Sequence, residues 1–213
     1  MQALDRFRDD VETVVGKMRH ELDDSEYGKV CDLKDRLLQL NSKNMVKINH
    51  SVMELVCAKH LIKNGFEVEV EHSLERVSCD VYAVKGYGSV IVEVETGFVA
   101  PENAVDPLTY LDARIASKIT RYSGFANKFI LATPPYYIMG IPPALTKPPR
   151  FRTDVEIAAI KGLCDLYYTS PPVTVEEIRN ARLHSIFALD VDRVSVREWE
   201  VNEYLGKAAL WTV

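Results

Sequence analysis

Residues 79–95 read CDVYAVKGYGSVIVEVE, two runs rich in β-branched and aromatic residues around the segment Lys85-Gly86-Tyr87-Gly88. Such runs favour strands, and a glycine-containing turn between them predicts a β-hairpin. A two-residue turn at 86–87 and a four-residue loop over 85–88 give the same register. Both place Asp80 directly opposite Glu93, where Cβ atoms are about 4.5–5.5 Å apart.

Two opposed carboxylates repel each other, and a cation between them removes that cost. Oxygen ligands at this separation suit Mg²⁺ or Mn²⁺. Strand alternation puts Glu95 on the face of Glu93 and turns the valines of 90–94 to the other face. The alternative is a solvated acidic face. Against it, the strand 90–95 is otherwise apolar, as in a strand covered on both sides.

The N-terminal segment is predicted to be helical. Leu4, Phe7, Val11, Val14 and Met18 follow a 3-4 spacing, and the pattern resumes with Val30, Leu33, Leu37 and Leu40 beyond an acidic turn. Residues 1–42 are therefore expected to form a helical hairpin. It either packs on its own domain or serves as an arm for a homodimer.

Elements of both kinds flank the hairpin. The sequence predicts a helix over 43–63, a strand over 66–71, a helix over 107–122 and a strand over 128–133. The segment 134–149 holds six prolines and is predicted to be a long loop. Beyond it we expect a helix over 153–168, a helix that begins with a Thr174–Glu177 capping box, and strands over 185–191 and 194–201. The expected divisions are 1–42, a core over 43–150 and a C-terminal α+β extension over 151–213.

Bulk composition is that of a globular protein, with 47% hydrophobic and 27% charged residues in 213. No apolar run reaches the roughly 18 residues of a membrane span, and no CxxC pair signals zinc. These features predict a soluble, cytoplasmic protein without a membrane partner. The net charge of −5 weakly opposes a nucleic-acid partner but leaves room for a local basic surface.

The order of helix with Glu54, strand, strand with Asp80, strand with Glu93, helix and strand resembles the PD-(D/E)XK nuclease superfamily. The resemblance covers roughly 43–134. It implies an α/β fold with a restriction-endonuclease-like core, that is, a central mixed β-sheet flanked by helices. It also implies that Glu54, Asp80 and Glu93 bind Mg²⁺ or Mn²⁺, and that the substrate is nucleic acid, with DNA favoured over RNA.

The sequence departs from that pattern at one position. Glu95 stands where the family carries a lysine that orients the attacking water. Some active members have a glutamate there, and others place the lysine on the neighbouring helix, for which Lys118 is the candidate. Arg114, Lys118 and Arg121 share one helix face by their spacing. That face is either part of the site or a solvated basic stripe.

Two functions are open at this point. In the first, the chain hydrolyses phosphodiester bonds with Asp80, Glu93, Glu95 and Lys118 as catalytic residues. Substrate contacts are then expected from Lys47, Arg114, Arg121 and Tyr136, the last of which could equally be a packed loop residue. In the second, the nuclease fold has lost catalysis and serves as a binding or scaffolding module.

Overall fold

The computed structural model describes residues 2–75 and 77–210, and the side chains from residue 6 onward. The side chain of Leu4, Met1 of the predicted hairpin and residues 211–213 of the predicted extension lie outside this description.

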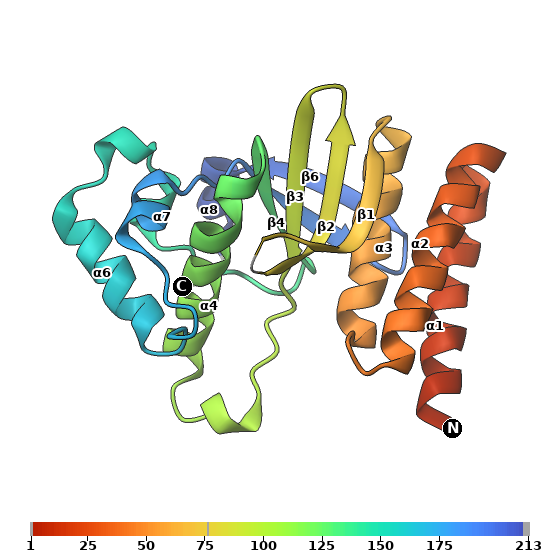
Figure 1. Ribbon diagram of the computed structural model, residues 1–213, viewed down its shortest axis with the longest axis horizontal. Coiled ribbons are helices and arrows are strands. Elements are labelled where there is room, and N and C mark those ends of the chain that lie inside the picture. The colour runs from red at the N-terminus through yellow and green to blue at the C-terminus, as the bar shows by residue number, and fades with distance from the viewer. Residues whose placement is uncertain (1, 76, 211–213) are drawn as a thin grey trace.

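The chain folds around one six-stranded mixed sheet with strand order β1-β2-β3-β4-β5-β6 (Figure 1). The strands β1 to β3 are antiparallel, β3 to β5 are parallel, and β6 is antiparallel to β5. The α/β class with a central mixed sheet is thus confirmed. The bounds are β1 Glu67–Ser73, β2 Ser78–Lys85, β3 Gly88–Val94, β4 Lys128–Thr133, β5 Ser185–Asp190 and β6 Ser195–Glu200.

The hairpin has the predicted register. Val81 pairs with Val92 and Lys85 pairs with Gly88, so the next step along the two strands brings Asp80 to Glu93. Gly86 takes a φ of +60°, which glycine adopts without the steric cost of a Cβ atom. The turn therefore sets the register that builds the site.

On one face of the sheet lie α2 Asp24–Ser42 and α3 Ile48–Lys63, and α1 Gln2–Met18 packs on the outside of these two helices (Figure 1). The described seam residues of α1, such as Val11 and Met18, are fully buried in one core with Val30 and Leu37 of α2 and Val92 of the sheet. The hairpin thus packs on its own chain, and a role as a dimerisation arm stays a prediction. Helix α3 begins at 48 rather than 43, because Asn44 takes a positive φ and interrupts the helix.

The other face carries α4 Pro107–Tyr122, α6 Asp154–Asp165 and α7 Val175–Asn180, with a second core around Ile91 and Phe129. Both faces of β3 are therefore covered, as its continuous apolar run predicts. The Thr174–Glu177 capping box is confirmed, and the proline-rich segment is a loop with one short helix, α5 Pro143–Thr146.

The C-terminal region differs in two details from the sequence-based expectation. Helix α6 ends at Asp165, and the last predicted strand ends at Glu200, where helix α8 Val201–Ala208 begins. Strands β5 and β6 of this region join the same sheet as the hairpin. Within residues 2–75 and 77–210, no helix combines the length and the apolar character that crossing a membrane requires.

Candidate metal centre

Acidic side chains from three elements meet where β2 and β3 leave the paired part of the hairpin. Helix α3 supplies Glu54, β1 supplies Glu71 and β2 supplies Asp80. One carboxylate oxygen of each lies within 4.8 Å of the others. This buried triad could hold a metal ion, since carboxylate oxygens are the ligands that hard divalent cations prefer.

Glu54 gives the strongest sign of a missing partner. Its side chain is fully buried, and neither carboxylate oxygen has a hydrogen-bond partner among the residues that the structure describes. A buried charge without a partner is strongly unfavourable, and proteins pair such groups or coordinate metals with them. A cation among the three carboxylates would give the Glu54 carboxylate the partner that it lacks.

Glu71 lies beside Asp80 because β1 and β2 pair Val70 with Val81 and His72 with Cys79, which brings Glu71 opposite Asp80. The φ of Glu71 is +47°, a left-handed conformation that is uncommon for residues other than glycine. Arg36 donates a hydrogen bond to the Glu71 carbonyl oxygen at 3.0 Å, which helps to hold this conformation. Strained backbone of this kind concentrates at functional sites. Sequence reasoning missed Glu71, because it showed only as one acid of an alternating strand.

Lys118 of α4 sits between the carboxylates of the hairpin. Its ammonium nitrogen lies 3.1 Å from Glu93 Oε2 and 3.4 Å from Asp80 Oδ2, and it donates to the Val94 carbonyl oxygen at 2.6 Å. Asp80 Oδ2 also accepts from the Val94 amide, and Glu93 Oε1 accepts from the Asp80 amide. The structure therefore brings Lys118 to Asp80 and Glu93, in the place that the resemblance implied.

Glu93 has a different place from the one expected. It adjoins Asp80 but is not in the group whose oxygens lie within 4.8 Å of one another, where Glu71 stands instead. Its carboxylate faces Lys118 and the Asp80 amide. Glu93 is therefore better placed to hold Lys118 and Asp80 than to complete the triad.

Burial and mutual repulsion shift the ionisation of this cluster. Burial, followed by the charges of Asp80 and Glu71, raises the pKa of Glu54 well above its usual range. Burial, followed by the charge of Asp80, raises the pKa of Glu71 to about 7 and that of Glu93 to about 8. Burial lowers the pKa of Lys118, but Asp80 and Glu93 outweigh it and raise that pKa overall. Lys118 therefore stays protonated, and its positive charge offsets the negative charges of Asp80 and Glu93.

Glu95 is held by Arg114. The Arg114 side chain donates from Nε to Glu95 Oε2 at 2.8 Å, its Nη2 lies 2.6 Å from Oε1, and its Nη1 donates to the Phe98 carbonyl oxygen. Glu95 is 2% exposed. Both oxygens are thus engaged by a permanent cation, which does not suit the catalytic role expected of Glu95.

The remaining predicted site residues are spread out. Arg121 is turned away from the cluster, because it donates to the Pro171 carbonyl oxygen and stacks over Tyr168. Lys47 is exposed immediately before α3. Tyr136 is 84% exposed and lines a cavity of about 490 Å³ with Asn49, Thr96 and Phe98.

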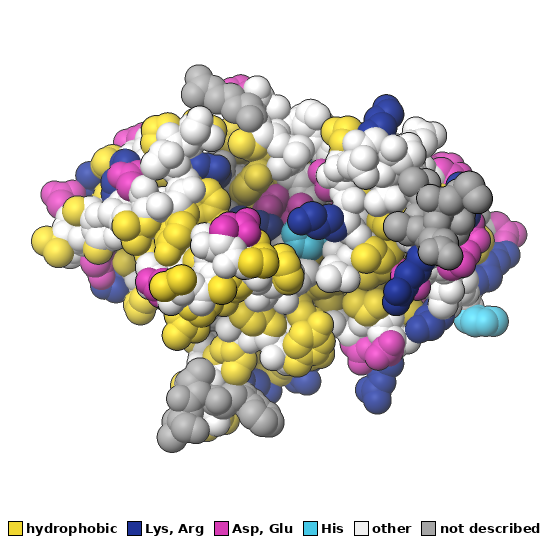
Figure 2. All heavy atoms as spheres, turned by 90° about the horizontal axis from the view of Figure 1, so that it is seen from below, with side chains coloured by type: hydrophobic (Ala, Val, Ile, Leu, Met, Phe, Trp, Pro, Cys, Tyr) yellow, Lys and Arg dark blue, Asp and Glu magenta, His cyan; other side chains and the backbone are white. Residues whose placement is uncertain are grey.

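Figure 2 shows acidic, basic and histidine side chains gathered in a hollow between the half that carries α4 and the half that carries α1 to α3. Hydrophobic side chains border this hollow on both sides.

No family model, no curated protein and no solved structure matches this chain.

Proposed function

We propose that this protein is a metal-dependent nuclease with a restriction-endonuclease-like core. The observation that carries the proposal is the fully buried Glu54 carboxylate, whose oxygens lack partners in the described chain and face Glu71 and Asp80. The nearby Asp80–Glu93–Lys118 contacts support it, since they join two acids and a lysine in the combination that the family uses.

The donor set fits a hard divalent cation. Glu54, Glu71 and Asp80 offer only oxygen ligands, which suits Mg²⁺ or Mn²⁺ and disfavours metals that prefer sulfur or nitrogen. When bound, such an ion lowers the pKa of a water and offsets charge on a phosphate.

Lys118 supplies the positive charge that the sequence lacks at Glu95. Its hydrogen bond to the Val94 carbonyl oxygen fixes the ammonium beside Asp80, so its positive charge is in place to offset negative charge on a bound phosphate. Arg114 holds Glu95 and the backbone at Phe98, and so shapes the rim of the site. Lys47 and Tyr136 are both exposed, and we expect them to offer a cation and an aromatic ring to a nucleic acid.

The direct test is cleavage of labelled single- and double-stranded DNA and RNA with Mg²⁺ or Mn²⁺. We expect cleavage of DNA in preference to RNA, no cleavage in EDTA, and a loss of roughly 100-fold or more in Asp80→Asn. The matched control is Glu67→Gln, which alters an exposed acid of β1 that pairs with Lys29. Cleavage that persists in Asp80→Asn would come from a contaminant and would defeat the proposal.

One observation favours a second function, that of a nucleic-acid- or protein-binding module without catalysis. Glu95 occupies the position of the family's lysine and is locked to Arg114. This alternative predicts Mn²⁺ binding and retention of nucleic acid with no cleavage of any substrate. Gel-shift measurements beside the cleavage assay separate the two functions.

A further inference from the structure

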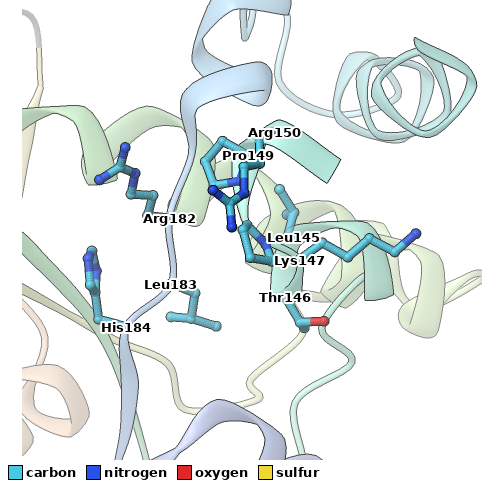
Figure 3. A pocket seen from close by; sticks show the side chains of 9 residues that line it. Leu145, Thr146, Lys147, Pro149, Arg150, Arg182, Leu183 and His184 are labelled. Carbon is cyan, nitrogen blue, oxygen red and sulfur yellow. The ribbon is translucent and has the colours of Figure 1, made fainter. Parts of the chain in front are cut away.

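A second cavity lies at the opposite end of the parallel strands from the acidic triad. The end of the proline-rich loop, 145–150, forms one wall, and the segment 182–184 that leads into β5 forms the other (Figure 3). Its volume is about 490 Å³. A cavity of that size takes a small organic molecule rather than a single ion.

Every ionisable side chain that lines this cavity is basic. They are Lys147, Arg150, Arg182 and His184. Lys147 pairs with Glu156, and Figure 3 shows it extending away from the segment 182–184. In the part of the chain that the structure describes, neither Arg150 nor Arg182 forms an ion pair. Two uncompensated guanidinium groups at a cavity are notable in a protein whose net charge is −5.

His184 adds a hydrogen-bond donor. Its Nδ1 accepts a hydrogen bond from the Phe129 amide at 3.0 Å, so the neutral ring carries its proton on Nε2. Burial lowers the pKa of His184, which keeps the ring neutral at physiological pH. The side chain therefore contributes an N–H group to the same wall as Arg182 (Figure 3).

Buried contacts hold both walls in place. Arg152 is buried and donates to the carbonyl oxygens of Ala144 and Lys147 in the loop and to that of Ile178 in α7. On the other wall, the Arg182 amide donates to Ser123 Oγ at 3.1 Å. The cavity is thus formed before any ligand arrives, which reduces the entropic cost of binding.

We propose that this cavity binds a phosphate-bearing small molecule, recognised by Arg150, Arg182 and the Nε2–H of His184. Guanidinium groups match phosphate oxygens in geometry and charge, and a neutral imidazole N–H completes such a site without adding repulsion between cations. This binding needs no divalent metal and does not depend on the proposed nuclease function.

The test measures melting temperature in EDTA with inorganic phosphate, pyrophosphate or adenosine 5′-monophosphate, each against sodium chloride of equal ionic strength. We expect at least one of these to raise the melting temperature of the wild type, and the three arms distinguish free phosphate from a nucleotide. The same rise is expected in Asp80→Asn, since the acidic triad is not involved.

The affinity of the best probe is then measured by calorimetry in variants of the cavity. Arg150→Gln and Arg182→Gln are each expected to weaken binding about 10-fold, and the pair roughly 100-fold. Both arginines are exposed, so folding should survive the change. Arg8→Gln on the exposed face of α1, at the other end of the molecule, is the control and should bind as the wild type does.

Three results would overturn the proposal. The first is a wild-type melting temperature that no phosphate compound raises above the chloride reference. The second is undiminished affinity in the double variant, which would place the anion elsewhere. The third is duplex DNA alone binding at these arginines, which would make the cavity part of a polyanion surface instead of a small-molecule site.

Discussion

At the scale of single residues, Glu54 has the least favourable position in the cluster. Its carboxylate is wholly buried, its oxygens are unpartnered among the described residues, and Asp80 and Glu71 raise its pKa further. Each unit by which folding raises the pKa of an acid costs about 1.4 kcal/mol of stability once that acid is ionised. Without a cation, Glu54 therefore weakens the fold that it belongs to.

Replacing Glu54 by glutamine should separate stability from metal binding. In EDTA at alkaline pH, Glu54→Gln is expected to raise the free energy of unfolding by about 1.4 kcal/mol or more. The reason is that glutamine has nearly the same shape as glutamate but brings no charge into the interior. The rise in melting temperature that Mn²⁺ gives the wild type should disappear. Glu67→Gln, at an exposed acid of β1, should change neither quantity by much. An undiminished Mn²⁺ effect in Glu54→Gln would rule out a metal at this triad.

Lys118 compensates two acids, so its removal should cost more than the loss of an ordinary ion pair. Lys118→Met leaves Glu93 and Asp80 without their cation and is expected to lower stability by roughly 3–5 kcal/mol above about pH 8, where Glu93 is ionised. The cost should shrink toward about pH 6, because Glu93, whose pKa is about 8, then holds a proton. The control is Lys128→Met, which breaks the exposed pair with Glu198 and should cost about 1 kcal/mol or less. Urea unfolding at both pH values measures this, and equal losses in the two variants would contradict it.

Sequence pattern predicted those site residues whose position follows from regular geometry. Asp80 and Glu93 were set by the hairpin register, whereas Lys118 was a candidate from the family resemblance and helical spacing only placed it on one face with Arg114. Glu71 was missed, because its place opposite Asp80 depends on the register of β1 and β2, and the connection 74–77 has no glycine or proline to mark a turn. Arg121 shares the predicted helix face, but its long side chain bends away from the cluster and donates a hydrogen bond to the Pro171 carbonyl oxygen.

At the scale of elements, the segment between β3 and α4 decides how the rim of the site is held. Gly97 has a φ of +74°, and a Cβ atom there would lie 2.7 Å from the Tyr137 ring. Two residues earlier, Glu95 is tied to Arg114 of α4. The turn at Gly97 therefore allows the chain that leaves β3 to pack closely against Tyr137 in the loop after β4.

A side chain at position 97 should disturb this junction. Gly97→Ala is expected to lower stability by about 1–3 kcal/mol, from the left-handed backbone and the contact with Tyr137 together. Any metal-dependent cleavage should fall as well, because Glu95 and Phe98 move with the turn. Gly124→Ala is the control, since a Cβ atom there meets nothing within 4 Å. Equal unfolding midpoints for the two variants in urea would count against this role of Gly97.

Elements with a strong period or a clear turn were predictable, and short elements without one were not. Strand β4 and helix α4 lie where the pattern put them. Helix α8 has only eight residues and follows β6 without a break, so no separating turn marks its start. Helix α3 starts late because Asn44 adopts a positive φ, which composition does not reveal.

At the scale of the whole molecule, the acidic triad and the basic cavity lie at opposite ends of the parallel strands. The acidic triad and Glu93 lie toward the carboxyl end of β3, and the cavity with Arg150 and Arg182 lies at the amino end of β5. A net charge of −5 describes neither site. Because β3, β4 and β5 are parallel, the carboxyl end of β3 and the amino end of β5 lie at opposite edges of the sheet. The directions of these strands were not predicted from the sequence.

The acidic cluster should give the protein a stability that depends on both pH and metal. Folding raises the pKa of Glu71 to about 7 and of Glu93 to about 8, both from 4.5, and raises that of Glu54 as well. The folded protein therefore binds more protons than the unfolded chain above pH 4.5, and its stability falls as the pH rises through these values. Burial lowers the pKa of His50 and His184, which acts in the opposite direction below about pH 6.5.

In EDTA, the free energy of unfolding is therefore expected to decrease between about pH 6.5 and pH 8. With saturating Mn²⁺ the decrease should be smaller or reversed, because metal ligands bind in their deprotonated form and the stabilisation by metal grows with pH. Urea unfolding across this range, with and without Mn²⁺, measures both curves. Glu71→Gln should flatten the EDTA curve near pH 7, whereas Glu67→Gln should not. An EDTA curve that stays level or rises over this interval would mean that the cluster is not held as a buried, mutually repelling set of carboxylates.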